Sequence, residues 1–564
     1  MQTQRDAAPV SEKTDVEGAA PPAPASAKPK PVRARFDHLD GCRTFCSFWV
    51  VMEHHASTLE TGDYAGGHFA PLFSKGNAPV SYFIVLSGFV MSYAYGERDF
   101  DGVAQTSFYI RRFGRVGLTY YCALLFQMGV TLLFNPYYRE HGWRILPPTC
   151  NYGGFEHNLF GWGEEGESNC SPTKGLLTNL LMAQACFNQY GMINATSWTV
   201  STLVCLWFAY PYLQPCLRSA SNRQLLFVVV LSVVLCWAVT LFVLSSRVLG
   251  PAAEQWWVGY GPTDPGWQKL AQVLHLSPVL LFPEYLLGLS SGLLCRRGWH
   301  KEMYGWSAVA TVAVLLVPVL ASLPNSALPG GNGWIGVMPD CAPDEPIDVG
   351  VVHGRCSGRS VFYEAVPAPL FALWMYASCT AVARATELGQ VKGASFGPVI
   401  DFVSSPVLSG IGKVSFQVYL FQESWAKIFK ELTSHVPTLD GVPKASDEGD
   451  TSGIFNLPRD SPNQAVYFVT FLLCLYTFAA AFVNYVEDPV MVHVMRWMAR
   501  AIKSKAVVNW FCAAGAVMAL LYWGMALGHT GWLCYLSVYG VSSVPLQARG
   551  IERDFPWVDG DVND

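Results

Sequence analysis

Charged side chains are scarce in this chain of 564 residues. Asp, Glu, Lys and Arg together make up 14% of it, whereas an ordinary soluble domain carries about 25%. Hydrophobic residues make up 51%, and several apolar runs reach about 20 residues without a charge, which is long enough to cross a bilayer. The shortage of charge therefore excludes an ordinary water-soluble protein. It predicts an integral membrane protein with the lipid bilayer as a partner.

Other features that the sequence lacks narrow the class further. The net charge of −5 is modest, so we expect no nucleic-acid partner. No apolar run opens the chain, so we expect no cleavable signal peptide, and residues 1–35 are expected to form a disordered cytosolic tail. No alternating barrel pattern is visible. Because a helix satisfies its own backbone groups in lipid, the predicted fold class is all-α, a polytopic transmembrane helix bundle.

About eleven segments are predicted to span the membrane, about ten in a core and an eleventh near the C-terminus. Four are uninterrupted apolar runs, at 225–244, 307–323, 465–485 and 507–527. Seven contain polar groups, at 45–51, 79–95, 117–134, 198–213, 276–295, 361–383 and 407–429. This organisation predicts a transmembrane domain over residues 36–500. An extra helix and a short exoplasmic tail are expected over 501–564.

Basic residues are concentrated in the short loops that face inward if the tail is cytosolic, which supports that orientation. These loops contain Arg98, Arg111, Arg112, Arg115, Arg218, Arg223, Arg296, Arg297, Lys301, Arg496, Arg500, Lys503 and Lys505. Two predicted outer loops hold one cysteine pair each, Cys150 with Cys170 and Cys341 with Cys356. An exoplasmic location would permit both pairs to form disulfides. Four free thiols are the alternative, because sequence alone does not fix pairing.

The first predicted helix carries many ionisable residues, and such residues inside a membrane are candidates for function. Eleven residues return a helix to within about 20° of its starting face and advance it by about 16 Å. Arg43 and His54 are eleven residues apart, so they are predicted to share one face, whereas His55 points away. Asp40 is close enough to Arg43 to pair with it on that face.

Several short motifs occur in the order found in a known family. They are LDG-x-R with His54 eleven residues after Arg43, FIVLSGF at 83–89, IRRFGR at 110–115, WTVS at 198–201 with Pro211, FPEYLLG at 282–288, GKVSFQVYL at 412–420 and YVEDP at 485–489. In these motifs the chain resembles the acyltransferase-3 family of multi-pass membrane O-acyltransferases, over roughly residues 36–500.

Two positions depart from the family pattern. Leu203 stands where the family usually has Glu, and Gln422 stands where it often has His, so a proton relay through those positions is absent or altered. Glu284 and Glu423 are the carboxylates that remain nearby in the pattern. Helix-end solvation is an equally simple explanation for each of them.

The resemblance implies transfer of an acyl group, commonly acetyl, from coenzyme A to a hydroxyl of an acceptor. His54 would act as the general base or would carry the acyl group itself, and the sequence leaves both routes open. The donor, acyl-CoA and most simply acetyl-CoA, would enter from the cytosol. Its phosphates would bind Arg111, Arg112 and Arg115, for which setting the topology is the alternative role.

Arg43 is assigned to catalysis with His54. A basic residue inside a membrane helix is costly and needs a partner, which would be either Asp40 or a phosphate of the donor. The residues predicted to line the substrate pocket are Asp40, Ser87, Trp198 and Glu284, although packing is the commoner role of a membrane Trp. No metal is expected. A glycan, a lipid and a small molecule are all open as the hydroxyl acceptor.

Two other functions compete with acyl transfer. A secondary transporter would also place charges within the membrane, but the inverted repeats typical of such proteins are not visible. An inactive family member that serves as a membrane scaffold is favoured by the changes at Leu203 and Gln422. Consumption of acyl-CoA would separate an enzyme from both alternatives.

Overall fold

A computed structural model describes residues 34–56, 77–134, 172–187, 193–248, 277–299, 306–322, 366–388, 395–434 and 463–535. These residues are mostly helical, and no strand occurs among them. The prediction of an all-α fold is therefore confirmed for this part of the chain. Cys150, Cys170, Cys341 and Cys356 lie outside the described residues, as does almost all of the N-terminal tail, so the disulfides and the disorder of the tail stay predictions.

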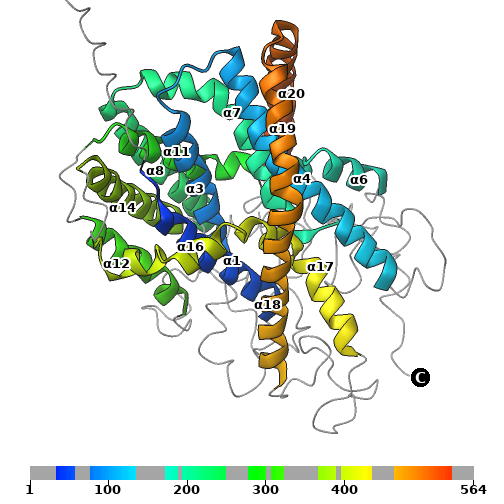
Figure 1. Cartoon of the computed structure of the whole chain (residues 1–564). Coiled ribbons are helices and arrows are strands. Elements are labelled where there is room, and N and C mark those ends of the chain that lie inside the picture. The colour runs from blue at the N-terminus through cyan, green and yellow to red at the C-terminus, as the bar shows by residue number, and fades with distance from the viewer. Residues whose placement is uncertain are drawn as a thin grey trace, which may run out of the picture.

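Long helices dominate the structure (Figure 1). The first half contains α1 (Asp37–Ala56), α3 (Asn77–Tyr95), α4 (Gly102–Phe134), α6 (Pro172–Leu180), η2 (Gln184–Phe187), η3 (Ala195–Ser197), α7 (Trp198–Ser219) and α8 (Asn222–Val248). The second half contains α11 (Pro278–Arg296), α12 (Trp306–Ser322), α14 (Pro367–Glu387), α15 (Pro398–Val403), α16 (Pro406–Gly412), α17 (Ser415–Ser434), α18 (Asn463–Phe482), η7 (Val483–Glu487), α19 (Asp488–Ala501) and α20 (Lys505–Tyr535). The π-helical η7 joins α18 to α19 in one continuous rod (Figure 1).

Short polar residues and prolines fix where several of these helices begin. Ser277 caps α11 by accepting a hydrogen bond from the backbone of Val279, and Pro278 follows it directly. Ser405 caps α16 in the same way, again just before a proline. A hydroxyl cap satisfies a backbone donor that the first turn leaves open, and proline suits the first helical position because it has no donor to lose. The loop-to-helix transitions are therefore encoded locally.

Glycines bring α3 and α11 into close contact. A Cβ atom on Gly88 would lie 2.4 Å from the carbonyl oxygen of Tyr285, and one on Gly288 would lie 2.1 Å from that of Val85. A Cβ atom on Gly292 would lie 2.3 Å from the carbonyl oxygen of Phe89. Small residues let membrane helices approach until their backbones touch, which maximises packing where lipid offers no hydrophobic driving force. The SGF and PEYLLG motifs are thus two halves of one helix contact.

A second close contact fixes the start of α1. A Cβ atom on Gly41 would lie 1.7 Å from the carbonyl oxygen of Val403, and one on Gly412 would lie 1.7 Å from that of Asp40. Thr44 adds a 2.7 Å hydrogen bond from its hydroxyl to the carbonyl of Leu408. The glycine of the LDG motif therefore lets α1 lie directly on α15 and α16. From there α1 continues along α17.

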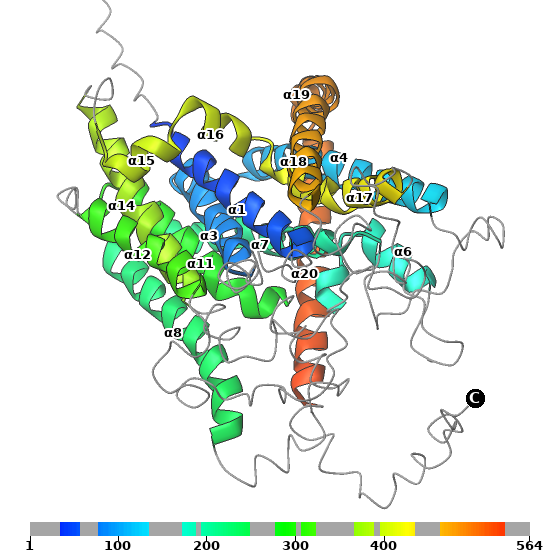
Figure 2. The same ribbon diagram turned by 90° about the horizontal axis from the view of Figure 1, so that it is seen from below.

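Within the described residues, five helical stretches are long and apolar enough to cross a membrane. They are Ala78–Tyr95, Gly102–Phe134, Pro278–Arg296, Val466–Ala501 and Lys505–Gly531, and two shorter apolar helices cover Asn222–Ala238 and Trp306–Val319. The expected span at 407–429 is divided between α16 and α17, and α20 runs across the direction of α18 and α19 (Figures 1 and 2). The chain is a helical membrane protein, while its count of ten core helices plus one stays a prediction.

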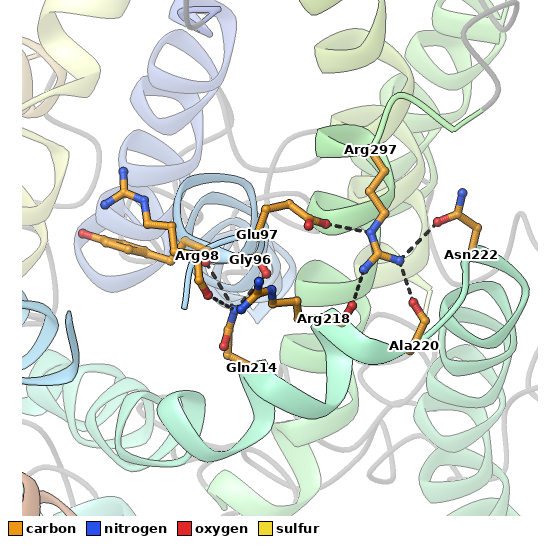
Figure 3. Close-up of polar contacts among 9 residues, drawn as sticks. Gly96, Glu97, Arg98, Gln214, Arg218, Ala220, Asn222 and Arg297 are labelled. Atoms are coloured by element: carbon orange, nitrogen blue, oxygen red, sulfur yellow. Dashed lines mark hydrogen bonds and ion pairs between the residues drawn. The ribbon is translucent and has the colours of Figure 1, made fainter. Parts of the chain in front are cut away.

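Hydrogen bonds and an ion pair connect α7 to the ends of α3 and α11 (Figure 3). Arg297 donates to the carbonyl oxygens of Ala220 at 2.6 Å and Arg218 at 2.7 Å, and its Nε is 2.7 Å from Glu97. The amide of Gln214 donates to the carbonyls of Gly96 and Arg98 at 2.8 and 2.9 Å (Figure 3). These bonds satisfy carbonyls that helix ends leave without partners. The turn between α3 and α4 is thereby held in a defined position.

Candidate active site

The C-terminal end of α1 lies against the middle of α17. There Nδ1 of His54 is 3.8 Å from Oε1 of Glu423, and Nε2 of His55 is 3.9 Å from the same oxygen. All three side chains are about nine-tenths buried, with 10% or 11% of each exposed. Both distances exceed a hydrogen bond, so these are polar contacts that a small movement would convert into hydrogen bonds. We call this group the His54–His55–Glu423 cluster.

The cluster corrects the expectation for His55. The helix period predicted that His55 points away from the side of His54, yet both imidazoles reach one carboxylate. Consecutive helix residues differ by about 100° in direction, so a group placed between their directions contacts both. The packing of α17 against α1 places the carboxylate of Glu423 there, and the helix period of α1 alone does not predict that packing.

Polar atoms without hydrogen bonds gather on the same stretch of α17. Gln422 is fully buried, and among the described residues neither its Oε1 nor its Nε2 has a hydrogen-bond partner. The same is true of Oε1 of Glu423 and of the indole Nε1 of Trp425. An unpaired buried polar group costs about 1–3 kcal/mol. This stretch is therefore where a polar ligand or ordered water is expected.

Arg43 lies near the opposite end of α1. Its Nη1 is 3.2 Å from Oδ1 of Asp40, so the pair expected from the sequence is present. The two side chains are 26% and 31% exposed, and Nε of Arg43 has no hydrogen-bond partner among the described residues. Asp40 thus satisfies only part of the guanidinium. The remaining donor of Arg43 is suited to an anion.

Arg112 on α4 lies close enough to Arg43 for the two positive charges to interact. Its guanidinium lies over the ring of Trp207, 5.0 Å from the ring centre. The indole of Trp207 in turn donates a 2.8 Å hydrogen bond to Ser87. Within the described part of the chain no carboxylate forms an ion pair with Arg112. Two neighbouring cations, one of them without an ion-pair partner, favour a bound anion such as a phosphate.

The three arginines of the IRRFGR motif have different surroundings. Arg111 is exposed, Arg112 is partly buried beside Trp207, and Arg115 forms ion pairs with two carboxylates. Nε of Arg115 is 2.8 Å from Glu487, and its Nη2 is 2.9 Å from Asp488. The predicted phosphate role of Arg115 therefore competes with an existing pairing, whereas that of Arg112 does not.

Glu487 is the centre of a buried polar group that the sequence did not single out. It is 1% exposed, and besides Arg115 it accepts hydrogen bonds from Thr119 at 2.7 Å and from the amide of Gln417. These partners come from α4 and α17, so the group joins three elements distant in sequence. Its signal was the YVEDP motif, in which a charged residue follows a long apolar run.

The two remaining residues predicted to line the pocket, Trp198 and Glu284, lie on different helices. Trp198 is buried at the start of α7. Four residues before it, the amide of Asn194 donates a 2.8 Å hydrogen bond to the carbonyl of Leu420 on α17. Glu284 on α11 accepts a 3.1 Å hydrogen bond from Ser81 on α3. Glu284 therefore joins α3 to α11, and Asn194 ties the start of α7 to the helix that carries Glu423.

Comparison with known proteins gives one result. Curated proteins and solved structures yield no match. A family model described as an acyltransferase domain matches residues 36–443, well over half of the chain and all of α1 to α17. The range includes the His54–His55–Glu423 cluster, Arg43 and Arg112. By this match, and by the motifs that α1, α3, α4 and α11 bring together, the chain belongs to the acyltransferase-3 family of membrane acyltransferases.

Proposed function

We propose that the protein transfers an acyl group, in the simplest case acetyl, from acyl-CoA to a hydroxyl of a glycan, lipid or small-molecule acceptor. The observation that carries this proposal is the make-up of α1. One end presents Arg43 within electrostatic range of Arg112, and the other end presents His54 beside Glu423. A cationic site and an imidazole joined by one helix fit a donor that has phosphates at one end and a thioester at the other.

The donor would bind at the Arg43 end. Arg43 and Arg112 supply two guanidinium groups for phosphate oxygens, and arginine matches phosphate through its planar fork. The eleven residues from Arg43 to His54 span about 16 Å of helix. The extended pantetheine arm of coenzyme A would cover that separation and bring the thioester to His54. Arg111, which is exposed and directly precedes Arg112 on α4, would add longer-range attraction.

His54 would act as the general base. Its Nε2 takes the proton of the acceptor hydroxyl while the hydroxyl oxygen forms a bond to the thioester carbonyl carbon. The carbon–sulfur bond then breaks, and the proton passes from His54 to the departing thiolate. The products are the acyl ester of the acceptor and free coenzyme A. No metal is needed for this sequence of steps.

The orientation of the protein in the membrane follows from the side on which the donor is present. Acyl-CoA is charged and does not cross lipid unaided, so the Arg43 end of α1 would face the cytosol with the N-terminal tail. The basic residues Arg496, Arg500, Lys503 and Lys505, at the junction of α19 and α20, would lie on the same side. The acceptor would then reach His54 from the opposite side or from within the membrane.

The test uses membranes of cells that express the protein, which supply their own acceptors. With radiolabelled acetyl-CoA, we expect label in a lipid, glycan or small-molecule fraction together with release of free coenzyme A. Membranes carrying His54→Ala are the matched control and should incorporate no label above background. A transporter or a scaffold predicts equal label in both membranes, and that result would refute the proposed function.

A further inference from the structure

We propose that Glu423 is the positioning residue of the active site, holding the Nδ1 proton of His54 so that Nε2 faces the acceptor hydroxyl. The inference rests on the proposed function. Its geometric basis is that Oε1 of Glu423 lies 3.8 Å from Nδ1, which is one specific nitrogen of His54. A carboxylate at Nδ1 selects the tautomer whose basic nitrogen is Nε2 and stabilises the imidazolium that forms during proton transfer.

Glu423 has few ionisable neighbours in the part of the chain that the structure describes. Among the described residues, His54 and His55 from α1 lie within 3.9 Å of it, and Lys427 from its own helix interacts with it electrostatically. Glu487 of η7 is hydrogen-bonded to Gln417 at the start of α17, and Glu53 of α1 directly precedes His54 in the chain. Neither α18 nor η3 contains Asp, Glu, Lys, Arg or His, and α4 contains none after Arg115. A buried carboxylate is expensive without a partner, so the two imidazoles are its natural ones.

His55 has a supporting role in this arrangement. Its Nε2 lies 3.9 Å from the same Oε1 and has no hydrogen-bond partner among the described residues. A second imidazole on one oxygen restrains the carboxylate and so keeps it directed at His54. Contacts of 3.8 and 3.9 Å would shorten to hydrogen bonds when substrate fills the site, because catalytic hydrogen bonds are often long in a free enzyme.

The closing experiment compares Glu423→Gln with wild type in the labelled acetyl-CoA assay. Glutamine keeps the size of the side chain and removes its charge. We expect kcat to fall by about 10²–10⁴-fold, as when a positioning carboxylate is neutralised in a triad, while KM for acetyl-CoA changes by less than about threefold because donor binding lies at the other end of α1. The matched control is Glu387→Gln, an exposed carboxylate at the end of α14 that should leave both constants unchanged.

A pH profile separates positioning from a purely structural role. Carboxylate charge beside an imidazole favours its protonated form, so removing that charge should shift the acidic limb of kcat/KM toward lower pH by about one unit. A general loss of folded protein would lower the whole profile without moving it. If Glu423→Gln does not fold, Glu423→Asp retains the charge with a shorter reach and should show a smaller loss of kcat at unchanged KM.

The outcomes distinguish this inference from the proposed function. A wild-type kcat and pH profile in folded Glu423→Gln, with His54→Ala inactive, would overturn the positioning role and leave acyl transfer standing. A wild-type kcat in Glu423→Asp, where only that variant folds, would overturn it as well. Equal incorporation of label in wild type and His54→Ala would instead refute the proposed function itself.

Discussion

Arg115 on α4 donates to Oδ1 of Asp488 at 2.9 Å, although the two residues are 373 positions apart in the chain. The adjacent Glu487 is 2.8 Å from the same guanidinium and is almost fully buried. The family match ends at residue 443. The helices beyond it are nevertheless part of one folded unit, because the buried carboxylate of Glu487 takes its partners from α4 and α17.

Replacing Arg115 with Ala is expected to lower stability more than donor affinity. The change leaves Glu487 buried without its cation, and removing one partner of a buried pair costs about 3–5 kcal/mol. Because Arg115 is 56% exposed, water replaces part of the interaction, and we expect about 1–3 kcal/mol. The measurement is the melting temperature of the purified protein in detergent, with the exposed Arg111→Ala as control. A raised KM for acetyl-CoA at an unchanged melting temperature would show instead that Arg115 binds the donor.

Arg43→Lys should weaken donor binding while the protein stays folded. Lysine keeps the charge beside Asp40 but lacks the planar fork that contacts two phosphate oxygens at once. We expect KM for acetyl-CoA to rise by about tenfold, which corresponds to about 1.4 kcal/mol, with a monodisperse elution profile. Aggregation together with an unaltered KM in the surviving molecules would show that Arg43 is a structural partner of Asp40.

His54→Ala should abolish acyl transfer, and His55→Ala should reduce it less. Removing a general base costs about 10²–10⁴-fold in rate, whereas His55 contributes only through the shared Glu423. The measurement is the rate of coenzyme A release in each variant, at matched amounts of monodisperse protein. It shows which variant loses more activity. Equal losses would mean that the two imidazoles act as a unit.

Gly288→Ala should destabilise the contact between α3 and α11. The added Cβ would lie 2.1 Å from the carbonyl of Val85, and backbone cannot rotate away as a flexible side chain can. Overpacking of this kind costs about 1–3 kcal/mol. Gly129→Ala on α4 is the matched control, because its Cβ meets nothing within 4 Å and alanine favours a helix. Comparable melting temperatures for the two variants would contradict the close contact.

A tag at the N-terminus should be cytosolic, and a tag after Asp564 should be exoplasmic. The expectation combines the basic inner loops with an odd number of spans. Protease treatment of sealed vesicles tests both ends separately. Protection of both tags, or cleavage of both, would show that the count of eleven spans is wrong by one.

The sequence predicted those features of the site that lie within one helix. The register of Arg43 with His54 and the pairing of Asp40 with Arg43 depend only on the pitch of an α-helix, and the second is seen at 3.2 Å. The short motifs, in the order found along the chain, also indicated the family, and two of them hold the glycines at which α3 and α11 touch. The sequence left the role of Glu423 open between catalysis and helix-end solvation, because that role depends on which side chains of another helix it contacts.

The sequence by itself determined that this is a helical membrane protein, because the length and composition of apolar runs dictate how backbone groups are satisfied in lipid. Only the tertiary structure decided which distant groups meet. It placed Glu423 beside both histidines, placed Arg112 over Trp207 within electrostatic range of Arg43, and paired Arg115 with Glu487 and Asp488. Such contacts follow from how α4, α17 and the rod of α18 and α19 pack, and packing depends on shape complementarity between helices that no local period encodes.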